Sequence, residues 1–155
     1  MEKRKLICLL SVLCILSVAA MVFALGSGTQ FTPPPFDPAA QTGTPVVPEG
    51  LGYQILDAGE FRVALCGEIR AEMTDAQVYL TNPPDNDVWL KVRILDGNGE
   101  ILGQSGLVRP GEYVQNITLD PLPAPGTPIV LKIMAYEPET YHSRGAVAVN
   151  TRMGE

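Results

Sequence analysis

The sequence predicts an all-β protein: an antiparallel immunoglobulin-like β-sandwich of about seven strands, preceded by one N-terminal transmembrane helix. Three observations support this prediction. Short runs of alternating apolar and polar residues fill the second half of the chain, and clusters of turn-forming residues separate them. The third is an apolar segment near the N-terminus that contains no charged residue.

The alternating runs predict the strands. In the clearest run, Val88, Leu90, Val92 and Ile94 alternate with more polar neighbours, which predicts that one face enters the core. No window outside the apolar segment carries a helical stripe. The expected strands lie at 61–66, 76–81, 88–95, 100–104, 113–119, 129–136 and 145–151.

Proline, glycine and asparagine mark the connections between these strands. Residues 82–84 read Asn-Pro-Pro, residues 109–111 read Arg-Pro-Gly, and residues 121–128 are rich in proline. Such residues stop strands, because proline lacks a backbone donor and glycine adopts positive φ angles. We expect the two proline-rich connections, at 82–84 and 121–128, to carry the chain from one sheet to the other.

The stretch 95–102, LDGNGEIL, allows two interpretations. Asp96, Asn98 and Glu100 alternate with glycines, as oxygen ligands do in a calcium loop. An EF-hand loop starting at Asp96 would need glycine at its sixth position and glutamate at its twelfth, where Ile101 and Leu107 stand. Asp-Gly and Asn-Gly dipeptides are typical of tight hairpins, so we predict a turn and no metal site.

The N-terminus predicts a membrane anchor. Residues 1–5 form a basic tail, and residues 6–26 form a transmembrane anchor or uncleaved signal that is long enough to cross a bilayer. The basic tail places the N-terminus in the cytoplasm and the following domain outside a cell membrane crossed once. Cleavage after residues 24–26 is an alternative, whereas bulky residues before Cys8 and Cys14 disfavour lipidation.

Residues 27–50 predict an extracytoplasmic linker. They include six prolines and few residues that could form a core. Such a segment is stiff and extended, so it could reach roughly 70 Å from the membrane. We expect a spacer there and the β-sandwich domain at 51–155.

Charge and cysteine content exclude several classes of protein. Removing Lys3, Arg4, Lys5 and Glu2 from the totals leaves 8 basic and 16 acidic residues beyond residue 26, a net charge of −8. Nucleic acids and anionic lipid surfaces are unfavourable partners for such a domain.

Cys66 is the one cysteine beyond residue 26, so no internal disulfide can form in the domain, and we expect Cys66 to be buried. A partly exposed Cys66 could instead link two copies.

No catalytic constellation is recognisable. The one histidine, His142, could pair with Cys66 or Ser143, but neither lies in a known nucleophile motif. We therefore predict that the protein is not an enzyme and has no cofactor.

The candidate interface consists of aromatic residues. Trp89 faces away from the predicted core on its strand, and Tyr136 and Tyr141 lie on or after a later strand. Exposed tryptophan and tyrosine often anchor interfaces. In the alternative interpretation, Trp89 packs structurally under Met134 or Tyr136.

The run from Val78 to Asp120 resembles a module found in small surface proteins of Gram-positive, Clostridia-like bacteria. The function of these proteins is unknown. The resemblance consists of turn residues: Asn82-Pro83, Asn86, Asp96-Gly97 and Pro110-Gly111-Glu112. It implies a membrane-anchored extracytoplasmic β-sandwich and supplies no catalytic residues.

These observations favour a non-catalytic interaction module, either an accessory component of a cell-envelope complex or a surface binding protein. Its expected partner is another envelope protein or a cell-wall polymer. The alternative is a carbohydrate-binding module in which Trp89, Tyr53, Tyr79, Tyr113, Tyr136 and Tyr141 offer stacking groups. An envelope hydrolase is a distant alternative.

Overall fold

The computed structural model describes residues 31–154. The chain divides into two units, Met1–Pro33 and Pro34–Glu155, and the fold described below is that of the second unit. The predicted basic tail and membrane anchor, residues 1–5 and 6–26, lie outside the described residues. Within the described part, no helix has the length and apolar character needed to cross a membrane.

All seven predicted strands are confirmed, with ends shifted by one or two residues, and three further short strands are present. The strands are β1 Gln41–Thr42, β2 Tyr53–Asp57, β3 Arg62–Cys66, β4 Arg70–Glu72, β5 Asp75–Thr81, β6 Trp89–Leu95, β7 Ile101–Gln104, β8 Glu112–Thr118, β9 Pro128–Tyr136 and β10 Ser143–Arg152.

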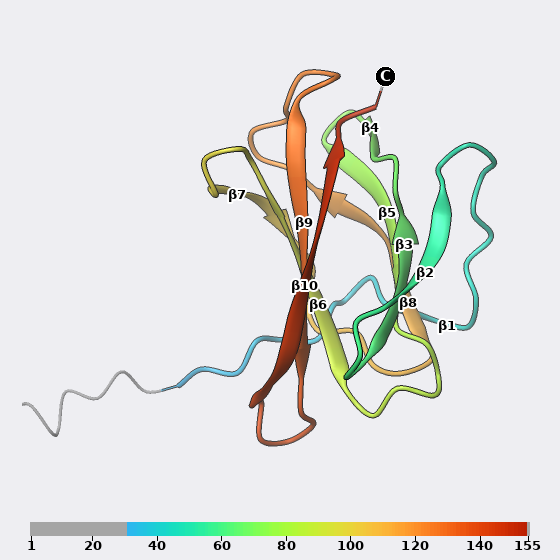
Figure 1. The fold of residues 1–155 in the computed structure, drawn as a ribbon, viewed down its shortest axis with the longest axis vertical. Helices are drawn as coiled ribbons and strands as arrows, with labels where there is room; N and C mark the ends of the chain where they lie inside the picture. Colours follow the sequence, from blue (N-terminus) through green and yellow to red (C-terminus); the bar gives the residue numbers. More distant parts are fainter. Residues whose placement is uncertain (1–30, 155) are drawn as a thin grey trace, which may run out of the picture. The chain divides into compact units, whose positions relative to one another are not determined.

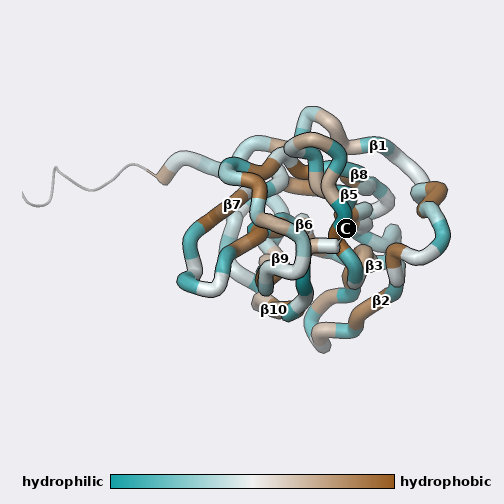
Figure 2. The backbone as a smooth tube through the Cα atoms, turned by 90° about the horizontal axis from the view of Figure 1, so that it is seen from above, coloured by the Kyte–Doolittle hydropathy of each residue, from teal (hydrophilic) through white to brown (hydrophobic). Residues whose placement is uncertain are grey.

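The strands form two antiparallel sheets (Figure 1). One sheet has the order β1-β8-β5-β3-β2, with β4 also paired to β5, and the other has the order β10-β9-β6-β7. Seen from above, the strands of the two sheets lie on opposite sides of the domain (Figure 2), and buried side chains from both sheets form one core. The predicted all-β, two-sheet architecture is therefore confirmed.

The alternation seen in the sequence places the core correctly. Val88, Leu90, Val92 and Ile94 are fully buried, as are Leu131 and Ile133 on the neighbouring strand β9. Successive strand residues point to opposite faces, so the residues between them lie on the outer face of this sheet.

The two proline-rich connections cross between the sheets, as predicted. The first joins β5 to β6 and the second joins β8 to β9, so each leaves the larger sheet and enters the smaller one. The connection from β7 to β8 crosses in the opposite direction.

The compact unit begins earlier than the predicted domain boundary at residue 51. Residues 34–50, expected to be part of a free spacer, pack onto the sandwich. Phe36 forms a parallel bridge with Leu107, and Gln41–Thr42 forms β1 against β8. Proline prevents helix formation but leaves carbonyls free to accept, and Pro35 accepts a hydrogen bond from Leu107 N–H at 2.9 Å.

The three strands that the sequence analysis missed are short or lie at edges. β1 has two residues, β4 has three, and β2 pairs on one side only, with β3. Ile55 in the middle of β2 remains 63% exposed. Without a buried stripe, such strands give no periodic signal.

Asn82, in the connection between β5 and β6, joins the two sheets. Its side chain is fully buried, and its Nδ2 donates to the carbonyls of Val88 at 2.8 Å and Val108 at 2.9 Å. Its Oδ1 accepts from Asn86 Nδ2 at 2.6 Å, and its backbone exchanges hydrogen bonds with the segment around Gly111. One amide therefore fixes the start of β6 against the end of β5.

We predict that Asn82→Ala lowers the free energy of unfolding by about 3 kcal/mol, because the carbonyl of Val88 loses its side-chain donor, the carbonyl of Val108 keeps only the N–H of Leu90, and Asn86 loses its acceptor. That loss corresponds to a fall in melting temperature of roughly 10 °C. Thermal unfolding followed by circular dichroism measures it. Asn116→Ala, at an exposed position of β8, is the control and should change stability by less than about 0.5 kcal/mol. Equal effects of the two substitutions would contradict the role assigned to Asn82.

Candidate functional site

The loop at residues 96–100 is a hairpin turn, as predicted. It joins the antiparallel strands β6 and β7, and Gly99 has a φ of +87°. Asp96 Oδ1 accepts the backbone N–H groups of Asn98 and Glu100, both at 2.8 Å. These hydrogen bonds, that of Glu100 above all, hold the pKa of Asp96 below its usual value. The carboxylate thus closes the turn.

The three aromatic residues predicted as an interface belong to, or adjoin, the outer face of the smaller sheet. On this face, residues directly opposite one another on β6 and β9 form three rows: Trp89 with Tyr136, Lys91 with Met134, and Arg93 with Lys132. We call these six residues the binding face. Figure 1 shows β6 and β9 as neighbours in this sheet.

An aromatic cluster forms one end of the binding face. Trp89 contacts Phe36 edge-to-face, with ring centroids 4.8 Å apart, and contacts Tyr141 at 5.3 Å. The guanidinium of Arg109 lies 3.5 Å from the centre of the Phe36 ring. Trp89 remains half-exposed.

The structure brings Trp89 and Tyr141 into contact and places Tyr136 directly across the strand pair from Trp89. Met134 and Tyr136 are the residues that were expected to cover Trp89 in the alternative interpretation. They interact with one another: Tyr136 Oη donates a hydrogen bond to Met134 Sδ at 3.6 Å. Phe36 is the residue that sequence reasoning missed. It was part of the expected spacer, and an aromatic among prolines was the one signal that could have identified it.

Three cations and Met134 occupy the rest of the binding face. Lys91 is only 8% exposed, Arg93 is half-exposed and Lys132 is exposed. Arg93 Nε donates to Gln104 Oε1 at 3.3 Å. Burial lowers the pKa of Lys91, and the neighbouring charge of Arg93 lowers it further. No carboxylate of the described residues lies within 4 Å of these three cationic groups.

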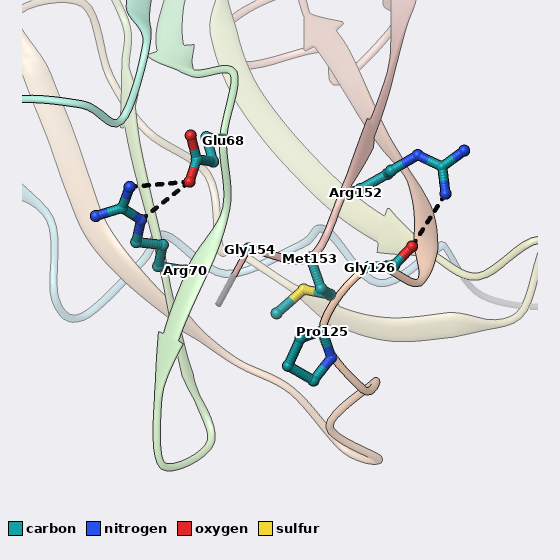
Figure 3. Close-up of a pocket in the computed structure, with 7 residues that line it drawn as sticks. All are labelled: Glu68, Arg70, Pro125, Gly126, Arg152, Met153 and Gly154. Atoms are coloured by element: carbon teal, nitrogen blue, oxygen red, sulfur yellow. Dashed lines mark hydrogen bonds and ion pairs between the residues drawn. The ribbon is translucent and has the colours of Figure 1, made fainter.

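A second surface feature is a pocket of about 550 Å³ near the C-terminus (Figure 3). Glu68 and Arg70 line it but pair with one another at 2.9 Å, and Arg152 donates to the carbonyl of Gly126 at 3.1 Å. Its polar groups are therefore already engaged.

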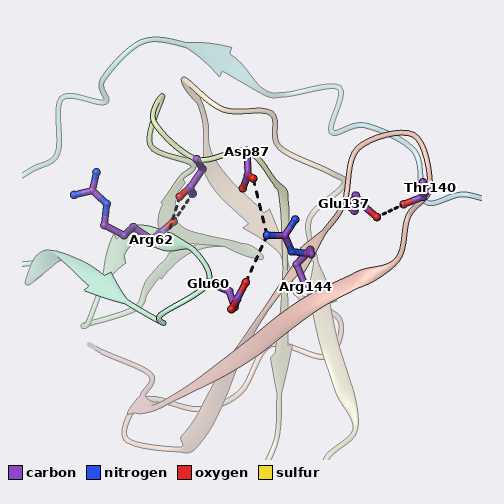
Figure 4. A network of polar contacts seen from close by, with 7 residues as sticks. Glu60, Arg62, Asp87, Glu137, Thr140 and Arg144 are labelled. Carbon is purple, nitrogen blue, oxygen red and sulfur yellow. Dashed lines mark hydrogen bonds and ion pairs between the residues drawn. The ribbon is translucent and has the colours of Figure 1, made fainter.

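A polar network crosses from the smaller sheet to the larger one (Figure 4). Arg144 of β10 lies 3.5 Å from Glu60 and 3.9 Å from Asp87. Nearby, Thr140 Oγ1 donates to Glu137 Oε2 at 2.8 Å within the loop between β9 and β10. The acidic groups drawn there have partners, so this network holds loops together.

Cys66 is fully buried, as predicted, and burial raises the pKa of its thiol to about 11. The alternative of a cross-link through a partly exposed Cys66 is therefore wrong. His142 lies in an exposed loop, with its Nδ1 3.8 Å from Glu137 Oε2. Within residues 31–154, no three histidine, cysteine, aspartate or glutamate side chains are grouped to hold a metal ion.

Comparison of the chain with protein-family models, with curated proteins and with solved structures finds no match. The geometry of the described residues is therefore the basis for the functional argument.

We predict that Phe36→Ala shifts the fluorescence emission of the protein to longer wavelength. Trp89 is the only tryptophan in the chain, and removing the Phe36 ring exposes its indole to water. Emission spectra of the folded variant check this. Ile55→Ala, at an exposed site on the other sheet, should leave the emission unchanged. An unchanged spectrum for Phe36→Ala would contradict the contact between the Phe36 and Trp89 rings.

We also predict that the free energy of unfolding falls as the pH rises from about 9 to about 11. The thiol of Cys66 ionises near pH 9.0 in the unfolded chain but only near 11 in the folded one, so alkaline pH favours the unfolded chain. Urea titrations at several pH values should give a shallower decline for Cys66→Ala. Burial also raises the pKa of Tyr53 and Tyr79, so part of the decline persists in that variant. Identical declines in both proteins would count against the burial of this thiol.

Proposed function

We propose that this protein is a non-catalytic binding module of the bacterial cell envelope, held at the membrane by residues 6–26. In this proposal, the sandwich lies outside the cell and contacts its partner through the binding face. The observation that carries the proposal is the composition of that face: a half-exposed aromatic pair, Trp89 and Tyr136, continues into three cations that lack carboxylate partners among the described residues.

The immunoglobulin-like arrangement and the bacterial origin belong to the same proposal. Two antiparallel sheets with connections that cross between them support the first. The resemblance to Clostridia-like surface proteins rests on turn residues, and Asn82 and Asn86 have defined hydrogen-bonding roles in this fold. Because residues from 34 onwards pack onto the sandwich, the proposed spacer is shorter than the segment 27–50.

The aromatic residues that remain available at the binding face favour a polymer as the partner in this proposal. Among the tyrosines considered for stacking, Tyr79 is only 4% exposed, whereas Tyr53 and Tyr113 belong to the other sheet. Trp89, Tyr136 and Tyr141 remain, gathered at one end of the binding face. Aromatic rings beside polar groups on a strand pair suit an extended saccharide chain, so we favour a cell-wall polymer.

We predict that the full-length protein, reconstituted in uncharged liposomes, sediments with isolated bacterial cell envelopes. Tyr136→Ser should weaken this retention several-fold, because it removes an aromatic ring from the binding face. Sedimentation at increasing envelope concentration measures it. Ile55→Ser is the matched control, since Ile55 is exposed on the opposite sheet and should not contribute.

Two results would overturn the proposed function. One is the absence of retention of the full-length protein, and the other is equal weakening by both substitutions. Melting temperatures of the two variants establish that each is folded before the comparison.

A further inference from the structure

We propose that the partner of the binding face is an anionic polysaccharide, whose acid groups are bound by Arg93, Lys132 and Lys91. This inference rests on the proposed function and specifies its ligand. It follows from strand register, from the distribution of charge and from the aromatic pair.

The register places two positive charges directly against one another. Arg93 of β6 and Lys132 of β9 are cross-strand partners, and like charges in this position destabilise a sheet. The next residues along this row do not reduce the repulsion between the two charges, because both are uncharged. Gln104 of β7 lies opposite Arg93, and Ala148 of β10 lies opposite Lys132. An acidic residue at either position would have neutralised the pair.

Elsewhere in the described part, four of the five other arginines are paired with acid, and the fifth, Arg152, donates to the carbonyl of Gly126. Carboxylates lie within 4 Å of four arginines: Arg62, Arg70, Arg109 and Arg144. Acidic residues outnumber basic ones 16 to 8 beyond residue 26, so carboxylates are plentiful. The cations of the binding face therefore differ from Arg62, Arg70, Arg109 and Arg144, because no carboxylate stands in the rows of this face.

Lys91 adds a third charge on the same strand. It lies between Trp89 and Arg93 on the outer face of β6 and is 8% exposed. A pocket of about 410 Å³ opens at Lys91 and Gln104, beside the segment that includes Phe36. Asp37 lines the pocket too, but its two oxygens accept the N–H groups of Ala39 at 2.9 Å and Gly106 at 2.7 Å. Since no carboxylate of the described residues lies within 4 Å of Lys91, an acid group of the ligand could pair with it directly.

The aromatic pair favours a saccharide over another polyanion. Trp89 and Tyr136 form one row, and Arg93 and Lys132 form the row two rows further along, four residues later on β6. From Trp89 to Arg93 the strand rises about 13 Å, at roughly 3.3 Å per residue, so one ligand that contacts both rows has to extend along the strand. Sugar rings can pack on the aromatic side chains while their acid groups reach the cations.

The test uses polygalacturonate, an acidic polysaccharide, and dextran, a neutral one, with the full-length protein in uncharged liposomes. We expect binding to polygalacturonate that weakens as salt is raised, because charge pairs at a surface are screened. The double variant Arg93→Gln/Lys132→Gln should bind at least ten-fold more weakly. Its melting temperature should not fall, since the substitution removes a repulsion.

The control is Arg62→Gln/Arg70→Gln, which changes the net charge equally at residues that already have carboxylate partners. Its affinity should change less than two-fold. Equal loss in both double variants, or no binding of polygalacturonate at low salt, would overturn the inference. Equally tight binding of poly-glutamate or single-stranded DNA would also overturn it, because the face would then select charge alone.

Failure of this inference can be told apart from failure of the proposed function. If envelopes retain the protein through Tyr136 while the Arg93/Lys132 double variant binds them normally, the binding module stands and the acidic ligand does not. If envelopes do not retain the protein at all, the proposed function itself is contradicted.

Discussion

The buried side chain of Asn82 is the constraint on which both sheets depend. Its amide donates to Val88 and Val108, and Val108 in turn exchanges two backbone hydrogen bonds with Leu90 on β6. Asn86 continues the network to Arg62 at the start of β3 through both of its amide atoms. Strand β6, which carries half of the binding face, is therefore held at its first residues. A buried polar group of this kind is favourable only because its partners are all in place.

Much of the fold could be predicted from the sequence, because buried strands leave a periodic record. Val88 to Ile94 alternate in sequence as they alternate between core and surface. Short edge strands give no periodic pattern of apolar residues. Phe36 lies among prolines, whose composition indicated a spacer. Its position depends on backbone pairing with Leu107, which composition does not reveal. The hairpin at Asp96 was predictable because its turn chemistry is local.

The candidate site was only partly predictable for the same reason. The aromatic residues Trp89, Tyr136 and Tyr141 could be proposed one by one from residue type. The cationic row could not, because it exists only once β6 and β9 align Arg93 with Lys132. The net charge of −8 beyond residue 26 even suggested that nucleic acids and anionic lipid surfaces are unfavourable partners. Charge averaged over a domain does not describe one face of it, and screening limits the influence of distant carboxylates to about 10 Å.

The central claim is that ligand binds on the outer face of β6 and β9. The most direct test is to follow the backbone amide resonances of the ¹⁵N-labelled protein in detergent micelles while oligogalacturonate is added. The account predicts shifts concentrated at residues 89–93 and 132–136, with neighbouring changes at Gln104 and Ala148. Shifts confined to β2, β3 and β5, or to the pocket around Arg70, would contradict it.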